Sequence, residues 1–405
     1  MPAAQRHAAK DRIARVLAPA PPQRIVHDRP PPEEGMMGVL VRMAEAVDTP
    51  PMKLMRDFAG LSFGPGRVSF SDYTRLRLYD EQFWAGCDRR TVIGARRNRD
   101  LMVQANYRHE WYGLAANKAA ANAYLAAYGF PVIPTTALFA LDIASPSPKL
   151  LRTRDELRQF LADPGVYPLF GKPVEGVQSL GSTAFAGFNA ERGVLRAPGG
   201  VETPLDHFLE DVCERYPTGY LFQPLLPPHP NVAAMTGGGL ATVRMITLAT
   251  EQGPKVVRAC WKIPGAGAFA DNYWRRGNLL AQLDLKTGQV LRVTCGAGLE
   301  LVEVTRHPGT RAPLIGAKVP GWQALKATAV EAARAMHGLG VIGWDMAPAE
   351  PGPVIVEMNE TPDLFLNQIA DRRGALDADF TAFLSSQRQA AAEHMERVKS
   401  DVGRL

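Results

Sequence analysis

The chain has 405 residues, of which 46% are hydrophobic and 21% are charged. This composition excludes a disordered or fibrous chain, and the length predicts two or three domains. The formal net charge of +5 suits an anionic ligand or substrate. The basic residues do not gather into one aromatic-rich stripe, so a nucleic-acid partner is not expected.

Cysteine usage and hydropathy set the expected compartment. The four cysteines stand singly, without a CxxC pair, so neither a zinc site nor a disulfide framework is expected. No stretch approaches the roughly 20 apolar residues of a membrane span, and the first residues lack the apolar core of a secretory signal. We therefore expect a cytoplasmic protein without a membrane span. The sequence does not predict its oligomeric state.

The first 110 residues are expected to form two regions outside the main fold. Residues 1–35 are basic and proline-rich, which predicts an arm and a linker. Residues 36–110 are rich in arginine and in helical patterns, which predicts a helical accessory region. Two interpretations of this region stay open: a solvated basic face, or a docking surface for an acidic partner.

From residue 111 the pattern changes to helices mixed with antiparallel hairpins, which is typical of an α+β fold. An alanine-rich helix ends at Gly129, and Thr153 begins a further helix. We expect one part of the main fold over residues 111–225 and a second over 226–385. A helical tail is expected over 386–405.

Two apolar strands near the C-terminal end carry oxygen-bearing side chains at matching positions. The turn PAEPGP joins the strand of Asp345 to the strand of Glu357 and Asn359, which predicts a short hairpin. With the turn centred near Pro351, Asp345 falls opposite Glu357, and Gly343 falls opposite Asn359. Two carboxylates this close are costly unless a cation joins them. Since carboxylate and amide oxygens suit Mg²⁺, the hairpin predicts a metal site; an exposed polar face is the alternative.

A metal–phosphate site also needs cations for the phosphates. Lys172 ends a strand, and the loop that follows it can bring backbone N–H groups to phosphate oxygens. This loop contains Gly176, Ser179, Gly181 and Ser182. Because the lysine precedes the glycines, the loop is not a Walker A motif. Taken alone, Lys172 and its loop could be an ordinary glycine-rich hairpin. Lys118 lies in the alanine-rich helix and, taken alone, could be a surface lysine.

Further polar side chains lie between this loop and the hairpin. Arg244 lies mid-strand among apolar residues, a position that is costly without an anion. Arg258 and Lys262 share one face of the next strand by period 2. The segment after that strand holds three more, Asn272, Arg275 and Arg276. Together these residues fit one pocket for anionic groups, whereas singly they could form surface ion pairs.

The order of these blocks resembles the ATP-grasp superfamily, and most of all its sugar-transfer-associated branch, which is related to α-L-glutamate ligases. The resemblance covers roughly residues 70–380. It rests on six blocks in the family's order: NKAAANAYLAAYGFPVIPT, FGKPVEGVQSLGST, YLFQPLLPPHPNV, GGGLATVRMITL, ADNYWRRGNLLAQLDLKTG and GWDMAPAEPGPVIVEMNETPDL. It implies an α+β ATP-grasp fold, in which two subdomains grip ATP between antiparallel sheets, with a helical N-terminal region.

The resemblance also implies three groups of site residues. The group that binds ATP comprises Lys118, Lys172, the lid residues Gly176, Ser179, Gly181 and Ser182, and the adenine-reading segment Phe222, Gln223 and Leu225. The group that holds one or two Mg²⁺ ions, or Mn²⁺, comprises Asp345, Glu357 and Asn359. The catalytic group near the γ-phosphate and the substrate comprises Lys172, Arg244, Lys262, Asn272 and Arg275.

The sequence departs from the family at two places. Leu180 stands in the lid where a glycine or a small polar residue is usual. Arg275 and Arg276 stand where two adjacent glycines are usual. The second departure alters the acceptor side, where the added arginines would read a carboxylate or a phosphate of the substrate.

The implied activity is that of a Mg-ATP-dependent ligase, which joins a small-molecule carboxylate to an amine through an acyl phosphate and releases ADP and phosphate. The basic pocket favours acidic or phosphorylated substrates. Two other functions stay open at this point. One is a small-molecule kinase that stops at phosphorylation, and the other is a non-catalytic scaffold that senses nucleotide.

Overall fold

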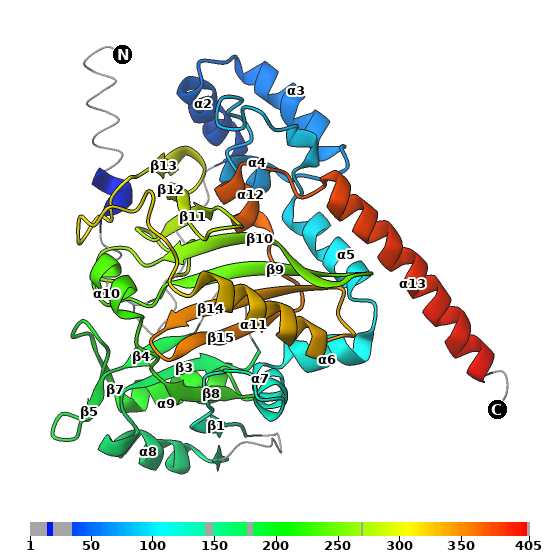
Figure 1. The fold of residues 1–405 in the computed structure, drawn as a ribbon. Helices are drawn as coiled ribbons and strands as arrows, with labels where there is room; N and C mark the ends of the chain where they lie inside the picture. Colours follow the sequence, from blue (N-terminus) through cyan, green and yellow to red (C-terminus); the bar gives the residue numbers. More distant parts are fainter. Residues whose placement is uncertain (1–13, 19–34, 142–148, 176–180, 269, 403–405) are drawn as a thin grey trace.

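The structure is a computed structural model, which describes residues 14–18, 35–141, 149–175, 181–268 and 270–402 (Figure 1). Within these residues the chain forms three β-sheets, of seven, five and three strands. In Figure 1 the seven-stranded sheet lies above the five-stranded sheet, and a group of N-terminal helices covers the top.

The seven-stranded sheet is antiparallel throughout. In pairing order its strands are β13 (Val302–Glu303), β12 (Val290–Cys295), β11 (Leu279–Leu283), β10 (Gly253–Ile263), β9 (Thr242–Thr250), β14 (Val341–Ala349) and β15 (Gly352–Asn359). Strand β14, the neighbour of the edge strand β15, is buried along its whole length.

The two faces of this sheet differ in chemistry. On one face Trp261 and Trp344 pack in the hydrophobic core beneath α11 (Trp322–Ala335). Because successive side chains of a strand point to opposite faces, their neighbours Lys262 and Asp345 point to the other face. Charged side chains are therefore held at the centre of the sheet, on the face away from α11.

The five-stranded sheet consists of β2 (Leu150–Leu151), β1 (Ala137–Phe139), β8 (Tyr220–Pro224), β3 (Leu169–Pro173) and β4 (Thr183–Phe185). The apolar sides of α8 (Arg154–Ala162) and α9 (Leu205–Arg215) pack on it. The predicted start of α8 is confirmed, because Thr153 forms a capping box with Glu156. The three-stranded sheet consists of β5 (Gly187–Asn189), β6 (Val194–Arg196) and β7 (Glu202–Pro204).

Helices make up most of the regular structure before the first strand, as the sequence predicts. They are α2 (Met36–Ala46), α3 (Pro51–Ser62), α4 (Phe70–Arg75), α5 (Ala95–Ala105), α6 (His109–Ala116) and α7 (Lys118–Ala127). The Asn117 side chain accepts a hydrogen bond from the Ala120 N–H and so caps α7. Gly129 follows the helix with φ of 78°, a left-handed conformation that ends it as expected.

Most of the predicted N-terminal arm lies outside the described residues. Residues 14–17 are helical, and Val16 is buried in the core of the seven-stranded sheet. The Arg276 guanidinium donates to the carbonyl oxygen of Arg15 at 2.9 Å from Nε. The described part of the arm is therefore packed against the main fold.

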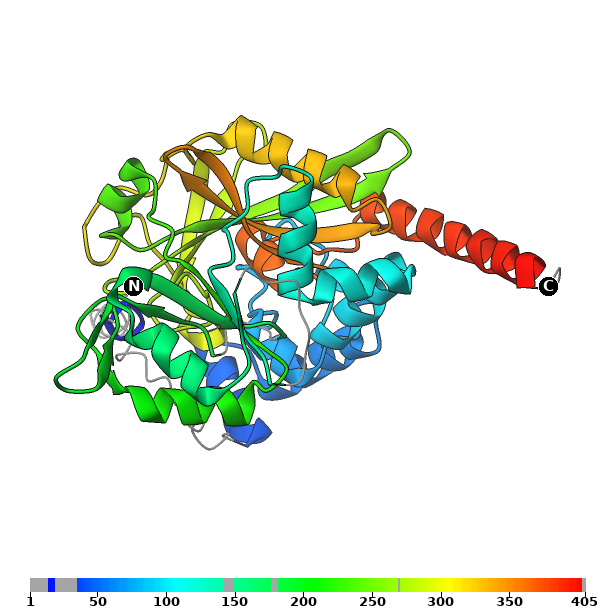
Figure 2. The same ribbon diagram turned by 90° about the horizontal axis from the view of Figure 1, so that it is seen from below.

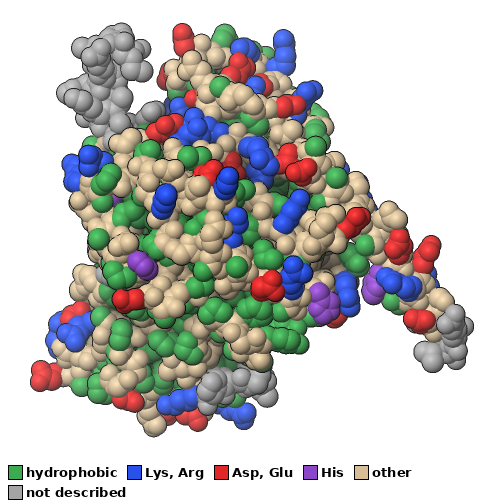
Figure 3. Space-filling view, in the orientation of Figure 1, with side chains coloured by type: hydrophobic (Ala, Val, Ile, Leu, Met, Phe, Trp, Pro, Cys, Tyr) green, Lys and Arg blue, Asp and Glu red, His purple; other side chains and the backbone are tan. Residues whose placement is uncertain are grey.

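The C-terminal part adds α10 (Pro230–Thr236), α12 (Phe365–Asp371) and α13 (Ala378–Val402), and 3₁₀ turns lie at Arg89–Thr91, Pro164–Val166 and Gly298–Glu300. The expected boundary at residue 386 falls inside α13, which runs out of the body of the molecule (Figure 2). No helix in the described ranges is both long and apolar enough to cross a membrane. On the face shown in Figure 3, basic and acidic side chains are interspersed.

Candidate active site

A pocket lies between the two larger sheets, and both contribute to its lining. The five-stranded sheet provides side chains from β3 and β8, and the seven-stranded sheet provides them from β9, β10, β14 and β15. The predicted site residues that line it are Lys118, Lys172, Ser182, Gln223, Leu225, Lys262, Asp345 and Glu357. Residues that are far apart in the sequence thus meet at one place.

The predicted hairpin is formed by β14 and β15, and its register is confirmed. Asp345 lies opposite Glu357, and Gly343 lies opposite Asn359. A bulge follows Asp345 and shifts the remaining pairs by one position towards the turn. Asp345 and Glu357 line the pocket. The Asn359 amide lies beside it and donates from Nδ2 to the Gly343 carbonyl oxygen at 3.4 Å.

Asp345 is at the centre of a buried charge network. Arg244 donates to both of its oxygens, from Nε at 2.6 Å and from Nη2 at 3.0 Å. The Lys262 Nζ lies 3.1 Å from the same carboxylate. Burial alone would raise the pKa of Asp345, but Arg244 and Lys262 together hold it well below its ordinary value. The carboxylate therefore stays ionised in a desolvated place.

Asp271 completes this network. It was not among the site residues predicted from the sequence. Its Oδ2 accepts hydrogen bonds from the backbone N–H of Thr242 at 2.7 Å and from the Thr242 hydroxyl. Its Oδ1 lies 3.5 Å from the Lys262 Nζ. Burial raises the pKa of Asp271, although Lys262 opposes the rise. Its place in the sequence, directly before the predicted Asn272, was the available signal.

The two predicted lysines differ in their partners. The Lys118 Nζ lies 3.4 Å from Glu357 Oε1. Lys172 is buried, and its Nζ donates to the Val356 carbonyl oxygen at 3.3 Å. Within the described residues Lys172 forms no ion pair, and burial lowers its pKa. It is therefore a buried cation without its own carboxylate at the wall of the pocket.

The predicted lid is only partly described. Gly176 and Ser179 lie outside the described residues. Gly181 has φ of 74°, and its carbonyl oxygen accepts a hydrogen bond from the Tyr220 hydroxyl at 2.7 Å. Ser182 lines the pocket. The described end of the loop is thus anchored to β8 by this hydrogen bond, and its role as a lid stays a prediction.

The predicted adenine-reading segment is β8 and the residue after it. The Phe222 side chain is buried in the core of the five-stranded sheet and does not line the pocket. The Leu225 N–H donates to the Pro168 carbonyl oxygen at 3.1 Å, so that N–H is already used. Gln223 lines the pocket and donates to the Ile133 carbonyl oxygen, but its Oε1 is buried without a hydrogen-bond partner. A ligand that donates an N–H would satisfy this oxygen.

Three predicted catalytic residues lie outside the pocket lining: Arg244, which binds the pocket residue Asp345, and Asn272 and Arg275. The Asn272 Oδ1 accepts from the Trp274 N–H at 3.1 Å, which stabilises the turn after the pocket. Arg275 is half-buried on the same turn, and burial lowers its pKa. Neither side chain lines the pocket.

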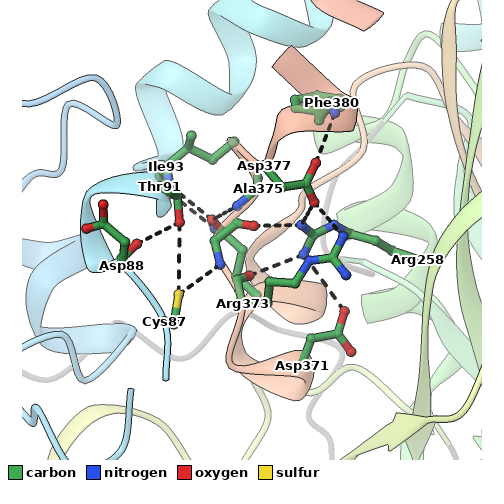
Figure 4. Close-up of polar contacts among 12 residues, drawn as sticks. Cys87, Asp88, Thr91, Ile93, Arg258, Asp371, Arg373, Ala375, Asp377 and Phe380 are labelled. Carbon is green, nitrogen blue, oxygen red and sulfur yellow. Dashed lines mark hydrogen bonds and ion pairs between the residues drawn. The ribbon is translucent and has the colours of Figure 1, made fainter. Parts of the chain in front are cut away.

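The expectation that Arg258 shares an anion pocket with Lys262 is wrong. Arg258 reaches the segment after α12, where it donates to the carbonyl oxygens of Arg373 and Gly374 and to Asp377 (Figure 4). Period 2 places Arg258 and Lys262 on one face, but four residues separate them along the strand. Different elements therefore cover the two side chains.

Residues 209–381 match the family model described as "Sugar-transfer associated ATP-grasp". The match spans less than half of the chain, so it shows a resemblance to the ATP-grasp superfamily over these residues. The match includes the strands of Arg244, Lys262, Asp345 and Glu357, and it confirms the expected α+β ATP-grasp fold. A search of curated proteins by sequence found no match.

Solved structures of ligases are similar to this chain at low identity. The D-alanine-D-alanine ligase from Coxiella burnetii has 14% identity and a TM-score of 0.41, over 72% of this chain and 61% of that chain. The enzyme of the same name from Bacillus anthracis has 14% identity and a TM-score of 0.37, over 72% and 70%. The N5-carboxyaminoimidazole synthase from Aspergillus clavatus has 14% identity and a TM-score of 0.34, over 62% and 45%. The chain thus spans less than two thirds of the first of these proteins.

The donor atoms of the ATP-grasp hairpin fit a magnesium ion. Asp345 and Glu357 supply carboxylate oxygens from directly opposed positions, and Asn359 lies two residues beyond Glu357. Such hard oxygen ligands are those that Mg²⁺ takes, together with water and phosphate oxygens. Across the described ranges, no group of three or more His, Cys, Asp or Glu side chains is placed to hold a metal. Two carboxylates and one amide are therefore the set that this hairpin offers.

Proposed function

We propose that the protein is a Mg-ATP-dependent ligase that joins a small-molecule carboxylate to an amine. The observation that carries the proposal is Lys172, a buried lysine that forms no ion pair within the described residues. It lines a pocket in an ATP-grasp fold and contacts the Val356 carbonyl oxygen of the carboxylate hairpin. An ATP phosphate would provide the missing anion. The orphaned Oε1 of Gln223 in the same pocket supports an adenine amino group as its donor.

The charges of the pocket suit Mg-ATP. The cations of its lining are Lys118, Lys172 and Lys262, and its carboxylates are Asp271, Asp345 and Glu357. Arg244 lies outside the lining and binds Asp345, which adds one positive charge to this balanced set and favours an anionic ligand. Lys118 and Lys262 now neutralise Glu357 and Asp345. When a metal binds those carboxylates, both lysines can turn to phosphate oxygens instead.

Asp345, Glu357 and Asn359 are the residues that would hold Mg²⁺. When bound there, the ion supplies positive charge that neutralises the phosphate oxygens during transfer. Arg244 and Lys262 keep Asp345 ionised, so the carboxylate is ready to bind a cation across the ordinary pH range. The bidentate pair with Asp345 also fixes the guanidinium of Arg244, which can then stabilise charge at the γ-phosphate without reorganisation.

The proposed reaction has two steps. A substrate carboxylate oxygen attacks the γ-phosphorus of ATP, the bond to ADP breaks, and an acyl phosphate forms. The amine nitrogen then attacks the acyl carbon, the carbon–oxygen bond to phosphate breaks, and the nitrogen loses a proton as phosphate leaves. No protein nucleophile is needed, so this chain's residues act by binding, orienting and stabilising charge.

The test is ADP release in the presence of Mg²⁺ against pools of carboxylates and amines, with amide products identified by mass spectrometry. Hydroxylamine, added in place of the amine, should trap the acyl phosphate as a hydroxamate. Lys172→Met should lower the rate by at least about 100-fold, whereas Lys255→Met, at an exposed position of β10, should leave it unchanged. A stable phosphorylated product without any hydroxamate would instead identify a kinase.

A further inference from the structure

A second cavity lies between α5, α13 and the segment that precedes α5, separate from the pocket between the two larger sheets, which is called the nucleotide pocket below. Its volume is about 430 Å³. It is lined by Pro65, Asp88, Arg90, Thr91, Arg97, Leu376, Thr381, Leu384, Ser385 and Arg388. None of these residues lines the nucleotide pocket. Figure 1 shows α5 and α13 side by side at this position.

The charges of this cavity are not balanced. Arg90 lies at the exposed rim and pairs with Asp88 at 3.0 Å. Arg97 and Arg388 form no hydrogen bond or ion pair within the described residues, and the Arg97 Nε is buried without a partner. Asp88, the carboxylate of the lining, is therefore already paired with Arg90. The guanidinium groups of Arg97 and Arg388 have no anionic partner within the described residues.

The guanidinium groups around this cavity repel one another. Burial lowers the pKa of Arg97, and the nearby guanidinium groups of Arg67 and Arg388 lower it further, against a weaker effect of Asp100. Like charges held together without a counter-ion destabilise the fold. An anion bound between them would remove this repulsion.

The rest of the lining suits an organic phosphate. Thr381, Ser385 and Arg388 follow at intervals of four and three residues on α13, so they lie on one face of that helix. Leu376 and Leu384 add apolar surface beside them. A volume of 430 Å³ lies within the range of small-molecule sites. Guanidinium groups bind phosphate oxygens in a bidentate manner, and a hydroxyl can add a further hydrogen bond.

We propose that this cavity binds a small phosphate monoester, with Arg97 and Arg388 on the phosphate and the apolar side chains on its organic group. The site is separate from the proposed ligase reaction. It would hold its ligand whether or not the nucleotide pocket is filled.

The test uses phenyl phosphate and inorganic phosphate as probes, titrated by calorimetry while a non-hydrolysable ATP analogue and Mg²⁺ saturate the other pocket. Phenyl phosphate should bind at one site, more tightly than inorganic phosphate and less tightly at high salt. Arg97→Met and Arg388→Met should each weaken this binding by tenfold or more. Arg96→Met is the matched control, because Arg96 is an exposed neighbour on α5 that does not line the cavity.

A second readout separates a binding site from a misfolded variant. Without phosphate, Arg97→Met should unfold at a higher temperature than the wild type, because the like-charge repulsion is gone. With phenyl phosphate, the Arg97 Nε–H signal in ¹H–¹⁵N spectra of the wild type should shift. The proposal is overturned if phenyl phosphate does not bind at millimolar concentration, binds no better than inorganic phosphate, or binds the three variants equally.

Discussion

At the residue scale, the pocket between the two larger sheets contains a buried cation, Lys172, that forms no ion pair within the described residues. Lys172 is buried, and its ammonium group donates to the Val356 carbonyl oxygen at 3.3 Å. Desolvation of such a charge is not repaid by an ion pair. We predict that Lys172→Met raises the unfolding temperature of the nucleotide-free protein and abolishes the further rise that Mg²⁺ and an ATP analogue cause. Thermal unfolding with and without nucleotide measures both effects.

The matched control for this prediction is Lys255→Met on β10, at an exposed position. It should change the free energy of unfolding by no more than about 0.5 kcal/mol, with or without nucleotide. If Lys172→Met is destabilised without nucleotide, the lysine has a structural role in the fold. If it keeps the full response to nucleotide, the lysine does not bind phosphate.

Arg244 is the opposite case, a buried cation with a partner. It is bound to Asp345 through two hydrogen bonds, at 2.6 and 3.0 Å. Removing one member of a buried pair leaves the other charge uncompensated. Because Lys262 still contacts Asp345, we predict that Arg244→Met lowers the free energy of unfolding by about 3 kcal/mol, the lower end of the range for such pairs. Urea denaturation measures this loss.

Arg334→Met provides the comparison, because Arg334 pairs with Glu331 on the surface, where both side chains are more than half exposed. Such a pair contributes at most about 1 kcal/mol. Equal losses in the two variants would mean that burial adds nothing to the Arg244 pair.

At the scale of elements, the end of α12 joins three parts of the molecule. Arg258 of β10 contacts the carbonyl oxygens that follow α12, and the Gly374 N–H lies 3.4 Å from the Cys87 Sγ (Figure 4). Asp371 ends α12 and lies 3.8 Å from the Arg258 guanidinium. A carboxylate at a helix C-terminus meets the negative end of the helix dipole.

Burial raises the pKa of Asp371 from 3.8 to about 6, although Arg258 and Arg373 oppose the rise. Between pH 4 and 6 the folded protein therefore holds a proton that the unfolded chain has released, so stability falls as the pH rises through this window. An amide carries no such penalty. We predict that Asp371→Asn is more stable than the wild type by roughly 3 kcal/mol at pH 7.5 and equally stable at pH 4. Denaturation at both pH values measures the difference.

The contrary result for this variant is also informative. If Asp371→Asn were less stable than the wild type at pH 7.5, the ion pair with Arg258 would outweigh the cost of burial. A difference that does not change between the two pH values would mean that the proton on Asp371 is not involved.

The elements also show what sequence patterns can and cannot predict. The register of Asp345 against Glu357 was predictable, because a short turn and side-chain period 2 fix a hairpin locally. The helix start at Thr153 was predictable from its capping residues for the same reason. Such local rules do not tell which elements pack against a strand, so the separate surroundings of Arg258 and Lys262 could not be predicted.

Contacts made by loops also could not be predicted from the sequence. Asp271 meets Thr242 because the segment after β10 folds back over the sheet, and no spacing in the sequence encodes that contact. Two unequal gaps, of 28 and 73 intervening residues, separate Asp271 from Thr242 and Asp345. The two carboxylates are nonetheless bridged by one lysine, Lys262. The assignment of each residue's role in catalysis stays a prediction until variants are measured.

At the scale of the whole molecule, the pocket depends on two sheets that are otherwise separate. Lys172 and Gln223 belong to the five-stranded sheet, and Asp345 and Glu357 belong to the seven-stranded sheet. A nucleotide with its metal would contact both sheets, so binding should stabilise them together. The size of the effect follows from mass action: about 2.7 kcal/mol at a ligand concentration of 100 times the Kd.

We therefore predict that a non-hydrolysable ATP analogue with Mg²⁺ raises the unfolding temperature by about 3–5 °C in a chain of this size, and that both sheets unfold in one shifted transition. Chelation of the metal with EDTA should remove most of the rise, because Asp345 and Glu357 would then face the phosphates without a cation between them. Asp345→Asn should behave with Mg²⁺ as the wild type does with EDTA. If the unfolding temperature still rises in the presence of EDTA, the hairpin is excluded as a metal site. If the protein unfolds in two transitions and only one of them shifts, the nucleotide contacts one sheet alone.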